Sequence, residues 1–422
     1  MHTFGPAALR GDISVPGDKS ISHRALFVAA RSRESTRVDN LNEGRDVRAT
    51  AEALRALGVE VDQNGSVALV RGARLQAPQR TIDCMNSGST ARMLLGLCAG
   101  AGLDATLDGD ESLRRRPMEP VAAQLRAFGA RIETSAGRLP AKIQGTSSPQ
   151  TRRFILLVPS AQIKTALLLA GLFSGIGVTT TADKGSRDHT ERLLQYHGAD
   201  ITFDRGTVEL KSAPRTYKDV SIPGDFSAAA FFIVGASIAP GSALRIRDVG
   251  VNPTRTGLLD ALSQMGASIE LEHVRDVCGE PRADIVVRYA PLRGIAIGPD
   301  LALRAIDEIL VLAVAAAFAE GETRITGIRE LRAKESDRVA AIIRLLDAVG
   351  IGVEQLPNGI AIRGGAPRAR SGVVIETHDD HRTAMSAAML ASAAGPLAID
   401  SASSIDVSFP DFLDRLATLQ AP

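Results

Sequence analysis

The residues able to do chemistry are concentrated where short apolar helices are predicted to begin. Six such starts recur along the chain, and each is crowded with polar or charged residues. Backbone N–H groups at a helix start are unpaired and carry partial positive charge, so anions bind there. A ring of such starts predicts an anion site, with a phosphorylated substrate as the first candidate. The six starts lie at 18–26, 86–94, 160–167, 225–231, 307–312 and 380–385.

The first start carries Lys19, Ser20 and Arg24 in the run DKSISHR. Arg24 follows Ser20 by one turn, so both are predicted to face the same way. Lys19 would supply a mobile point charge, and Arg24 a planar fork that fits a carboxylate or phosphate. The alternative is a capping serine flanked by surface cations.

The segment 329–338 (RELRAKESDR) carries the strongest such signal. Lys334 and Arg338 are four residues apart and are predicted to share a helical face, with Glu335 beside them. Such a group would hold an anion and keep a carboxylate available for proton transfer. An exposed helix with internal salt bridges is the alternative interpretation.

Acidic residues head the most apolar helix of the chain, at Asp307 and Glu308. At least one should sit at the edge of the core, where burial could raise its pKa toward the range of a general base. A plain N-cap role for Asp307 is the alternative. The run HDDHR at 378–382 resembles a metal cluster, but its spacing is crowded and Arg382 would repel an ion. We therefore predict an anion site in which Asp and His orient Arg382, and no metal.

Two further segments could approach a ligand. Gly88, in a polar turn into a helix, would let the backbone come close to it, although a simple helix cap explains the neighbouring serines equally well. The run 114–116 is predicted to be a loop, with Pro117 opening the next helix and fixing Arg116 over a cleft.

A repeat of about 70 residues organises the chain. Five helices are predicted to end at a C′ glycine followed directly by a strand, at Gly58, Gly129, Gly198, Gly266 and Gly350. A further strand in each copy, around Val38, Leu107, Thr180, Ile246, Ile325 and Ile399, leads into a loop. Five of these loops are predicted to carry arginine: Arg45 with Arg48, 114–116, Arg187, Arg255, and Arg329 with Arg332. The chain is thus predicted to hold six copies of one α/β unit.

Two similar segments, ISVPGDKS and VSIPGDFS, bracket half of these copies. They predict an inner domain at 18–224 and an outer domain at 1–17 plus 225–422, with three repeats each.

Composition favours an enzyme that acts on small molecules. The 422 residues carry a formal net charge of +1 and 4% aromatic residues, which argues against nucleic-acid binding. Cys84, Cys98 and Cys278 have neither metal-like nor paired spacing, which predicts reduced thiols in a cytoplasmic protein. The start of the chain lacks the features of a signal peptide, and the longest apolar run, 309–319, is too short to span a bilayer.

Taken together in order, the motifs resemble those of the 3-phosphoshikimate 1-carboxyvinyltransferase (EPSP synthase) family over nearly the whole chain. This resemblance implies two similar domains of the α/β class, each of three βαβαββ-type units (an inverse α/β barrel), hinged around a central cleft that closes on substrate. It implies transfer of an enolpyruvyl group from phosphoenolpyruvate to the 5-hydroxyl of shikimate 3-phosphate, with release of phosphate. It implies neither cofactor nor metal, and a monomer is expected. The motifs are PGDKSISHRAL, NSGSTAR, RRRPM, SAQIKTALLLAGL, SRDHTE, PGDFSAAAFF, NPTRTG, LRAKESDR, DDHRTAM and SFPDF.

The resemblance also implies which residues bind and react. Asp307 would accept the proton of the substrate hydroxyl, and Glu335 with Lys19 would protonate the methylene carbon. Shikimate 3-phosphate would be held by Lys19, Ser20, Arg24, Ser160, Ala161, Gln162, Arg187, Asp307 and Lys334. Phosphoenolpyruvate would be held by Lys19, Gly88, Arg116, Gln162, Arg338 and Arg382.

A few residues differ from the family pattern, and two alternative functions are considered. Val407 stands where many relatives have a lysine, and Glu330 where some have asparagine; Gly88, where tolerant relatives have alanine, suggests inhibition by glyphosate. The sister enzyme that transfers enolpyruvate to UDP-N-acetylglucosamine normally has a cysteine in the loop matching 114–116, which this chain lacks. A non-catalytic protein that binds phosphoanions is the second rival, but it would not need Lys19, Asp307 and Glu335 together.

Overall fold

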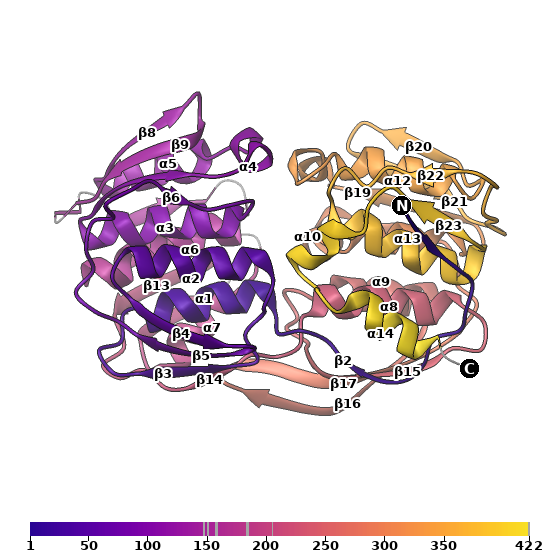
Figure 1. Ribbon diagram of the computed structural model, residues 1–422, viewed down its shortest axis with the longest axis horizontal. Helices are drawn as coiled ribbons and strands as arrows, with labels where there is room; N and C mark the ends of the chain where they lie inside the picture. Colours follow the sequence, from indigo (N-terminus) through magenta and orange to yellow (C-terminus); the bar gives the residue numbers. More distant parts are fainter. Residues whose placement is uncertain (147, 150–151, 157–158, 183–184, 205, 421–422) are drawn as a thin grey trace. The chain divides into compact units, whose positions relative to one another are not determined.

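The chain divides into two compact units in the computed structural model (Figure 1). Unit 1 consists of Met1–Pro16, Pro223–Arg275 and Pro281–Pro422, and unit 2 of Gly17–Ile222 and Asp276–Glu280. The structure describes residues 1–146, 148–149, 152–156, 159–182, 185–204 and 206–420.

Unit 2 contains three sheets built on one plan. In the second and third sheets a strand leads through a helix to a parallel neighbour, whereas in the first sheet the parallel neighbour of β3 is β14, from the end of the unit. In all three, a second helix leads to an antiparallel hairpin that completes the sheet. The orders are β14-β3-β5-β4, β6-β7-β9-β8 and β10-β11-β13-β12. In chain order the elements are α1 (Lys19–Ala29), β3 (Thr36–Asp39), α2 (Arg45–Ala56), β4 (Glu60–Asn64), β5 (Val67–Arg71), β6 (Ile82–Asp83), α3 (Gly88–Ala101), β7 (Asp104–Asp108), α4 (Glu111–Arg115), α5 (Glu119–Phe128), β8 (Arg131–Ser135), β9 (Arg138–Gln144), β10 (Arg153–Ile155), α6 (Ala161–Ser174), β11 (Val178–Thr181), α7 (His189–Tyr196), β12 (Asp200–Asp204), β13 (Thr207–Ser212) and β14 (Val220–Ser221).

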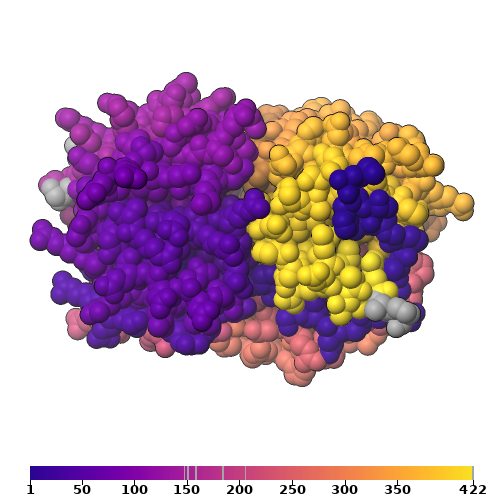
Figure 2. Space-filling model, viewed as in Figure 1, coloured from indigo at the N-terminus to yellow at the C-terminus, as the bar shows by residue number. Residues whose placement is uncertain are grey.

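Unit 1 has two four-stranded sheets of the same kind, β16-β17-β15-β2 and β18-β19-β21-β20, and one three-stranded sheet, β1-β23-β22, in which the single strand β1 takes the place of the hairpin. Strand β1 pairs with β23, so the first residues lie against the C-terminal part of this unit (Figure 2). Its elements are β1 (His2–Phe4), β2 (Arg10–Ser14), α8 (Phe226–Ile238), β15 (Ala243–Gly250), α9 (Gly257–Met265), β16 (Ser268–Val277), β17 (Glu280–Arg288), β18 (Ala296–Ile297), α10 (Pro299–Arg304), α11 (Ile309–Ala317), β19 (Glu322–Thr326), η1 (Arg329–Ala333), α12 (Arg338–Asp347), β20 (Val353–Leu356), β21 (Gly359–Arg363), β22 (Val374–Ile375), α13 (His381–Ala394), β23 (Leu397–Ile399), η2 (Ser403–Val407) and α14 (Phe412–Leu419).

The predicted helix ends and strands are confirmed. All five predicted C′ glycines have positive φ, a conformation that glycine adopts without steric cost, and a strand follows each of them. The six strands predicted before the loops are β3, β7, β11, β15, β19 and β23.

The six predicted helix starts are also confirmed, as α1, α3, α6, α8, α11 and α13. Five of them are capped by the side chain of a polar residue, as where Asp18 accepts the backbone N–H of Ile21 at 2.8 Å. The exception is α11, whose N-cap is Glu308 and has no capping side-chain bond. The N-cap interpretation of Asp307 is therefore wrong.

The arginine-bearing loops are only partly as predicted. Arg45 and Arg48 lie in α2, and Arg114 and Arg115 lie in α4. Arg329 and Arg332 lie in η1, a short 3-10 helix. In place of Pro117, Pro120 occupies the first turn of the following helix, α5. Arg116 follows α4 directly and has extended backbone, so it is held by a helix end and not by a loop.

Close helix packing positions the site in unit 2. On α3, a Cβ at Gly96 would lie 2.2 Å from the carbonyl oxygen of Ala166, and one at Gly100 would lie 2.1 Å from that of Ala170. These glycines let the backbones of α3 and α6 approach each other more closely than any larger residue would permit. The two helices therefore begin side by side.

Unit 1 has a core of three helices that are buried all round or nearly so, α8, α11 and α13. Such helices bring several polar starts together, because each packs on the others along its length. Among the described residues, no helix is long and apolar enough to cross a membrane.

Candidate active site

In unit 2 the starts of α3 and α6 are joined by hydrogen bonds. Gln162 of α6 accepts from Arg92 Nη1 at 2.8 Å and donates to Ser89 Oγ at 3.0 Å. Arg92 also donates to the carbonyl oxygen of Pro117 at 2.9 Å. The predicted residue Gln162 is thus fixed in place by an arginine that the sequence analysis missed, although Arg92 lies one helical turn after Gly88.

A second arginine points to the same helix start. Arg116 donates to Asn86 Oδ1 and, at 3.3 Å, to Ser112 Oγ. A Cβ at Gly88 would lie 2.7 Å from Arg92 Nη1 and 3.6 Å from Arg116 Nη1. Gly88, Arg116 and Gln162, predicted separately, are therefore brought together with Arg92 at one place.

Arg24 of α1 connects its own helix to two other helices of unit 2, α6 and α7. Its guanidinium donates to Ser20 O at 2.7 Å, to Thr190 Oγ1 at 2.9 Å and to Thr165 Oγ1 at 3.1 Å. The bond to Ser20 is to its backbone carbonyl, so the predicted shared direction of the two side chains stays a prediction. Burial lowers the pKa of Arg24 to about 10, and the neighbouring Arg187 adds to this effect. Arg24 therefore remains charged at neutral pH, and its positive charge, with Arg187 nearby, suits a phosphate.

The other residues predicted in unit 2 lie at the same helix starts. Lys19 Nζ is 2.9 Å from Asp46 Oδ2, which ties the start of α1 to α2. Ser160 caps α6 through the backbone N–H of Ile163 at 3.4 Å, and Ala161 is the first residue of that helix.

His23, in α1, gives a pH dependence that can be tested. Its Nδ1 lies 2.7 Å from Thr50 Oγ1, and burial lowers its pKa from 6.5 to about 3. Between these two pKa values the unfolded chain binds a proton that the folded chain does not. The free energy of unfolding therefore decreases by about 1.4 kcal/mol for each unit by which the pH is lowered. When the pH is lowered from 7.5 to 5, we expect the free energy of unfolding of His23→Gln to decrease by about 2 kcal/mol less than that of the wild type. Urea unfolding at the two pH values measures this difference.

The matched control for this prediction is His378→Gln. His378 is half exposed, so its replacement should leave the pH dependence of unfolding as in the wild type. An unchanged slope in His23→Gln would contradict the prediction.

In unit 1, Arg338 is buried among three carboxylates. It lies 2.6 Å from Glu335 Oε2, 3.0 Å from Asp380 Oδ2 and 3.6 Å from Asp307 Oδ1. Burial alone would lower the pKa of Arg338, but Asp380, Glu335 and Asp307 outweigh burial and raise the pKa above its ordinary value. Its charge is therefore permanent, and Asp307 and Glu335 are both fixed beside it.

Lys334 reaches the same carboxylate from another direction. Its Nζ is 2.7 Å from Glu330 Oε1 and 3.9 Å from Asp307 Oδ1. The predicted helical face shared by Lys334 and Arg338 is wrong, because Lys334 has extended backbone after η1 and Arg338 begins α12. Glu330, where some relatives have asparagine, anchors Lys334 here.

Arg382 is held differently from the prediction. It donates to the carbonyl oxygen of Asp307 at 2.7 Å and to Ser227 Oγ at 3.0 Å. Asp380 Oδ1 accepts the backbone N–H of Arg382 at 2.9 Å, whereas Asp380 Oδ2 accepts from the Arg338 side chain at 3.0 Å. Asp380 therefore orients Arg338 and not the guanidinium of Arg382.

Arg382 is also close to a buried acid, Glu308. Glu308 Oε1 accepts from Ser227 at 2.5 Å and from Arg255 at 2.9 Å, and it lies 3.6 Å from Arg382 Nη1. At least one of Asp307 and Glu308 was predicted to lie at the edge of the core, but no partner was predicted for Glu308. Ser227 and Arg255 stand in motifs that carried the resemblance, and their role here was missed.

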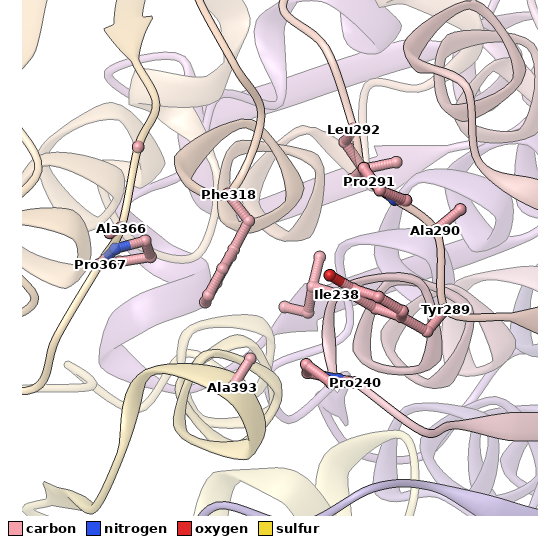
Figure 3. Close-up of a pocket in the computed structure, with 11 residues that line it drawn as sticks. Ile238, Pro240, Tyr289, Ala290, Pro291, Leu292, Phe318, Ala366, Pro367 and Ala393 are labelled. Atoms are coloured by element: carbon pink, nitrogen blue, oxygen red, sulfur yellow. The ribbon is translucent and has the colours of Figure 1, made fainter.

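A cavity of about 300 Å³ lies elsewhere in unit 1 (Figure 3). It is lined by Ile238, Phe318 and Ala393, which stand at the C-terminal ends of α8, α11 and α13, and by Tyr289 and Pro291. The predicted anion-binding residues stand at the opposite ends of these helices, and this cavity has no charged lining residue. It is not the predicted site.

The comparisons with known proteins agree over the full length. The family model for EPSP synthase (3-phosphoshikimate 1-carboxyvinyltransferase) matches residues 4–416. The chain belongs to the EPSP synthase family. It is 44% identical to the 3-phosphoshikimate 1-carboxyvinyltransferase of Geotalea uraniireducens, with 100% of this chain and 99% of the relative covered. It is 46% identical to that of Halorhodospira halophila, with 98% and 94% covered.

Solved structures share the fold of this chain. EPSP synthase from Acinetobacter baumannii superimposes with a TM-score of 0.87 at 36% identity, over 100% of this chain and 98% of that one. The enolpyruvyl transferase NikO from Streptomyces tendae gives a TM-score of 0.80 at 18% identity, over 99% and 97%. The second likeness concerns the fold alone and confirms the inverse α/β architecture.

Proposed function

We propose that the chain catalyses the reaction that names its family. The enolpyruvyl group of phosphoenolpyruvate is transferred to the 5-hydroxyl of shikimate 3-phosphate, which yields 5-enolpyruvylshikimate 3-phosphate and phosphate. The observation that carries this proposal is the match to the family over residues 4–416, together with full-length relatives that bear the same enzyme name.

Unit 2 is proposed to hold the anionic groups of both substrates. Arg24 and Arg187 would bind the 3-phosphate, with Lys19, Ser20, Ser160, Ala161 and Gln162 completing the shikimate 3-phosphate site. Gly88 and Arg116 would bind phosphoenolpyruvate, with Lys19 and Gln162 contributing to both. The support is local: Arg116 and Gln162 are each fixed by hydrogen bonds at the start of α3, where backbone N–H groups attract anions.

Unit 1 is proposed to carry the proton transfers. Asp307 takes the proton of the 5-hydroxyl as its oxygen attacks C2 of phosphoenolpyruvate, and Glu335 or Lys19 protonates C3. Lys334 would also bind shikimate 3-phosphate, and Arg338 and Arg382 would also bind phosphoenolpyruvate. The same three cations would stabilise the tetrahedral intermediate, which bears a carboxylate and a phosphate. The bond from C2 to the phosphate oxygen then breaks while a proton of the new methyl group returns to the residue that supplied it, which re-forms the double bond between C2 and C3 and releases phosphate. Because Arg338 is fixed by three carboxylates, little reorganisation is needed as charge develops.

Phosphate release tests the substrate directly. The purified chain is incubated with phosphoenolpyruvate and either shikimate 3-phosphate or UDP-N-acetylglucosamine, and phosphate is measured. We expect release only with shikimate 3-phosphate. Release only with the UDP-sugar would favour the sister activity, and release with neither, together with retained binding of phosphoanions, would favour a binding protein.

Glyphosate sensitivity is predicted to depend on Gly88. In Gly88→Ala the new Cβ would lie 2.7 Å from Arg92 Nη1, so the guanidinium must move and its bond to Gln162 is strained. We expect the wild type to be inhibited, and the variant to need about tenfold more glyphosate and to show a raised KM for phosphoenolpyruvate. Initial rates with phosphoenolpyruvate near its KM measure both effects.

Gly5→Ala is the control for this prediction, since a Cβ there meets no atom within 4 Å. It should behave as the wild type. Full wild-type activity at high glyphosate would refute the predicted inhibition, and equal sensitivity of Gly88→Ala and wild type would refute the role of Gly88.

The proposal extends to a monomeric cytoplasmic enzyme without cofactor, with domains at 18–224 and at 1–17 plus 225–422. The Cys84 and Cys98 thiols are buried, and burial raises the pKa of Cys98 to about 12, as suits thiols that stay reduced. Sedimentation at assay concentrations tests the oligomeric state.

A further inference from the structure

The hairpin formed by β16 and β17 is shared between the two units. Its strands pair with unit 1, but its tip, Asp276–Glu280, belongs to unit 2. Cys278 and Gly279 both have positive φ, and Gly279 N–H donates to Asp276 Oδ1 at 3.1 Å. This tight turn places Glu280 beside α7, within unit 2.

The tip contacts one face of α7. Glu280 Oε1 lies 2.7 Å from His189 Nδ1, and Arg192 donates to the carbonyl oxygen of Gly279 at 3.3 Å. His189, Arg192 and Tyr196 are three and four residues apart and so share a side of the helix. A Cβ at Gly279 would come within 3.5 Å of Tyr196 Cβ. The absence of a side chain at Gly279 thus permits the close contact.

The Glu280–His189 contact lies at the shikimate 3-phosphate end of unit 2. Both residues are buried, at 4% and 2% exposure, so losing the bond between them would leave polar atoms away from water. His189 is the first residue of α7, and the next residue, Thr190, accepts from Arg24 Nε at 2.9 Å. Thr190 is bonded in turn to Thr165 at 2.6 Å. Movement of the first turn of α7 would therefore move Thr190 Oγ1, the acceptor that orients the Arg24 guanidinium.

We infer that Glu280 is a positioning residue for shikimate 3-phosphate. By bonding His189 it fixes the first turn of α7, and through Thr190 it sets the direction of the Arg24 guanidinium. The inference rests on the proposed function, because it assigns Arg24 to that substrate. A hairpin that served only to join the units would affect stability without distinguishing the two substrates.

The test is Glu280→Gln, which keeps the size of the side chain and removes its charge. We expect KM for shikimate 3-phosphate to rise about tenfold, with KM for phosphoenolpyruvate and kcat each within twofold of the wild type. Glu272→Gln is the matched control: it makes the same change on the same hairpin, but Glu272 bonds Arg245 within unit 1. It should leave both KM values unchanged.

A double variant separates positioning from loss of structure. If Glu280 acts through His189, His189→Gln should raise KM for shikimate 3-phosphate alone, and Glu280→Gln added to it should have little further effect. Unchanged KM for shikimate 3-phosphate in both single variants, or an equal rise for both substrates, would overturn the inference. In that event an active wild type would still support the proposed function, whereas a wild type inactive with shikimate 3-phosphate would overturn both.

Discussion

Asp307→Asn is expected to lower kcat by about 10²- to 10⁴-fold, the range found when a positioned general base is removed. Asp307 Oδ1 lies 3.6 Å from Arg338 Nη1 and 3.9 Å from Lys334 Nζ, so a carboxylate here is held between two cations beside the proposed reaction centre. Asparagine keeps the shape but cannot take the proton of the substrate hydroxyl. The carbonyl oxygen of Asp307, which accepts from Arg382, is unchanged by the substitution.

Two measurements separate loss of chemistry from loss of binding. Calorimetry should show shikimate 3-phosphate binding to Asp307→Asn within about threefold of the wild type, while steady-state phosphate release falls by at least about 100-fold. Asp347→Asn is the control, because Asp347 is an exposed acid that pairs only loosely with Arg370, at 3.3 Å. A kcat for Asp307→Asn close to that of the control would remove Asp307 from the role of base.

The proposed substrate-binding cations already have protein acceptors. Lys19 is bonded to Asp46, Arg116 to Asn86, and Arg338 to Glu335. Each side chain is therefore fixed in direction before any substrate anion arrives, which reduces the entropy lost on binding. Glu335 consequently has two functions in the proposal, since it orients Arg338 and is a candidate proton donor.

The repeats were predictable because their signals are local. A C′ glycine adopts positive φ wherever the helix ends, and a capping residue such as Ser87 needs only the next turn of backbone. Each of these features recurs in five of the six copies, so each copy supports the others. The strand that completes the first sheet of unit 2 had no such signal. Val220 pairs with Val38, which lies near the other end of unit 2 in the sequence, and no pattern around either residue predicts this pairing.

Lys334 and Arg338 were wrongly predicted to share a helical face because their spacing was used without locating where the helix begins. Asp337 caps α12 by accepting the backbone N–H of Ala340 at 3.0 Å, so the helix begins only at Arg338. The capping rule applied to Asp337 would have found this start. Lys334 and Arg338 do meet near Asp307, but they do so through a turn and not along a helix.

The missed residues depend on tertiary contacts. Arg92 was a charged residue in an apolar helix, and only the crossing of α3 and α6 brings it to Gln162. Arg255 and Glu308 are 53 positions apart, and no pattern in the sequence pairs them. The docking of Glu280 on His189 spans 91 positions. In each case local rules give the direction of a side chain, but its partner is set by how the repeats pack.

Glu308→Gln is expected to lower the free energy of unfolding by about 3–5 kcal/mol, the cost typical of removing one partner from a buried ion pair. The side chain of Glu308 is fully buried, accepts from Arg255 at 2.9 Å, and lies 3.6 Å from Arg382. Glutamine is neutral and places N–H donors against guanidinium donors, so two buried cations lose compensation. Urea unfolding at neutral pH measures the loss, and the KM for phosphoenolpyruvate should rise because Arg382 loses support.

An exposed pair in the same unit calibrates this effect. Glu270 lies 3.4 Å from Arg288 with both side chains more than half exposed, so Glu270→Gln should cost at most about 0.5 kcal/mol and leave both KM values unchanged. The two substitutions remove the same charge and differ in burial and partners. If Glu308→Gln unfolded within about 1 kcal/mol of this control, Asp225, which lies 3.7 Å from Arg255, would be sufficient to balance the buried arginines. The support assigned to Glu308 would then be wrong.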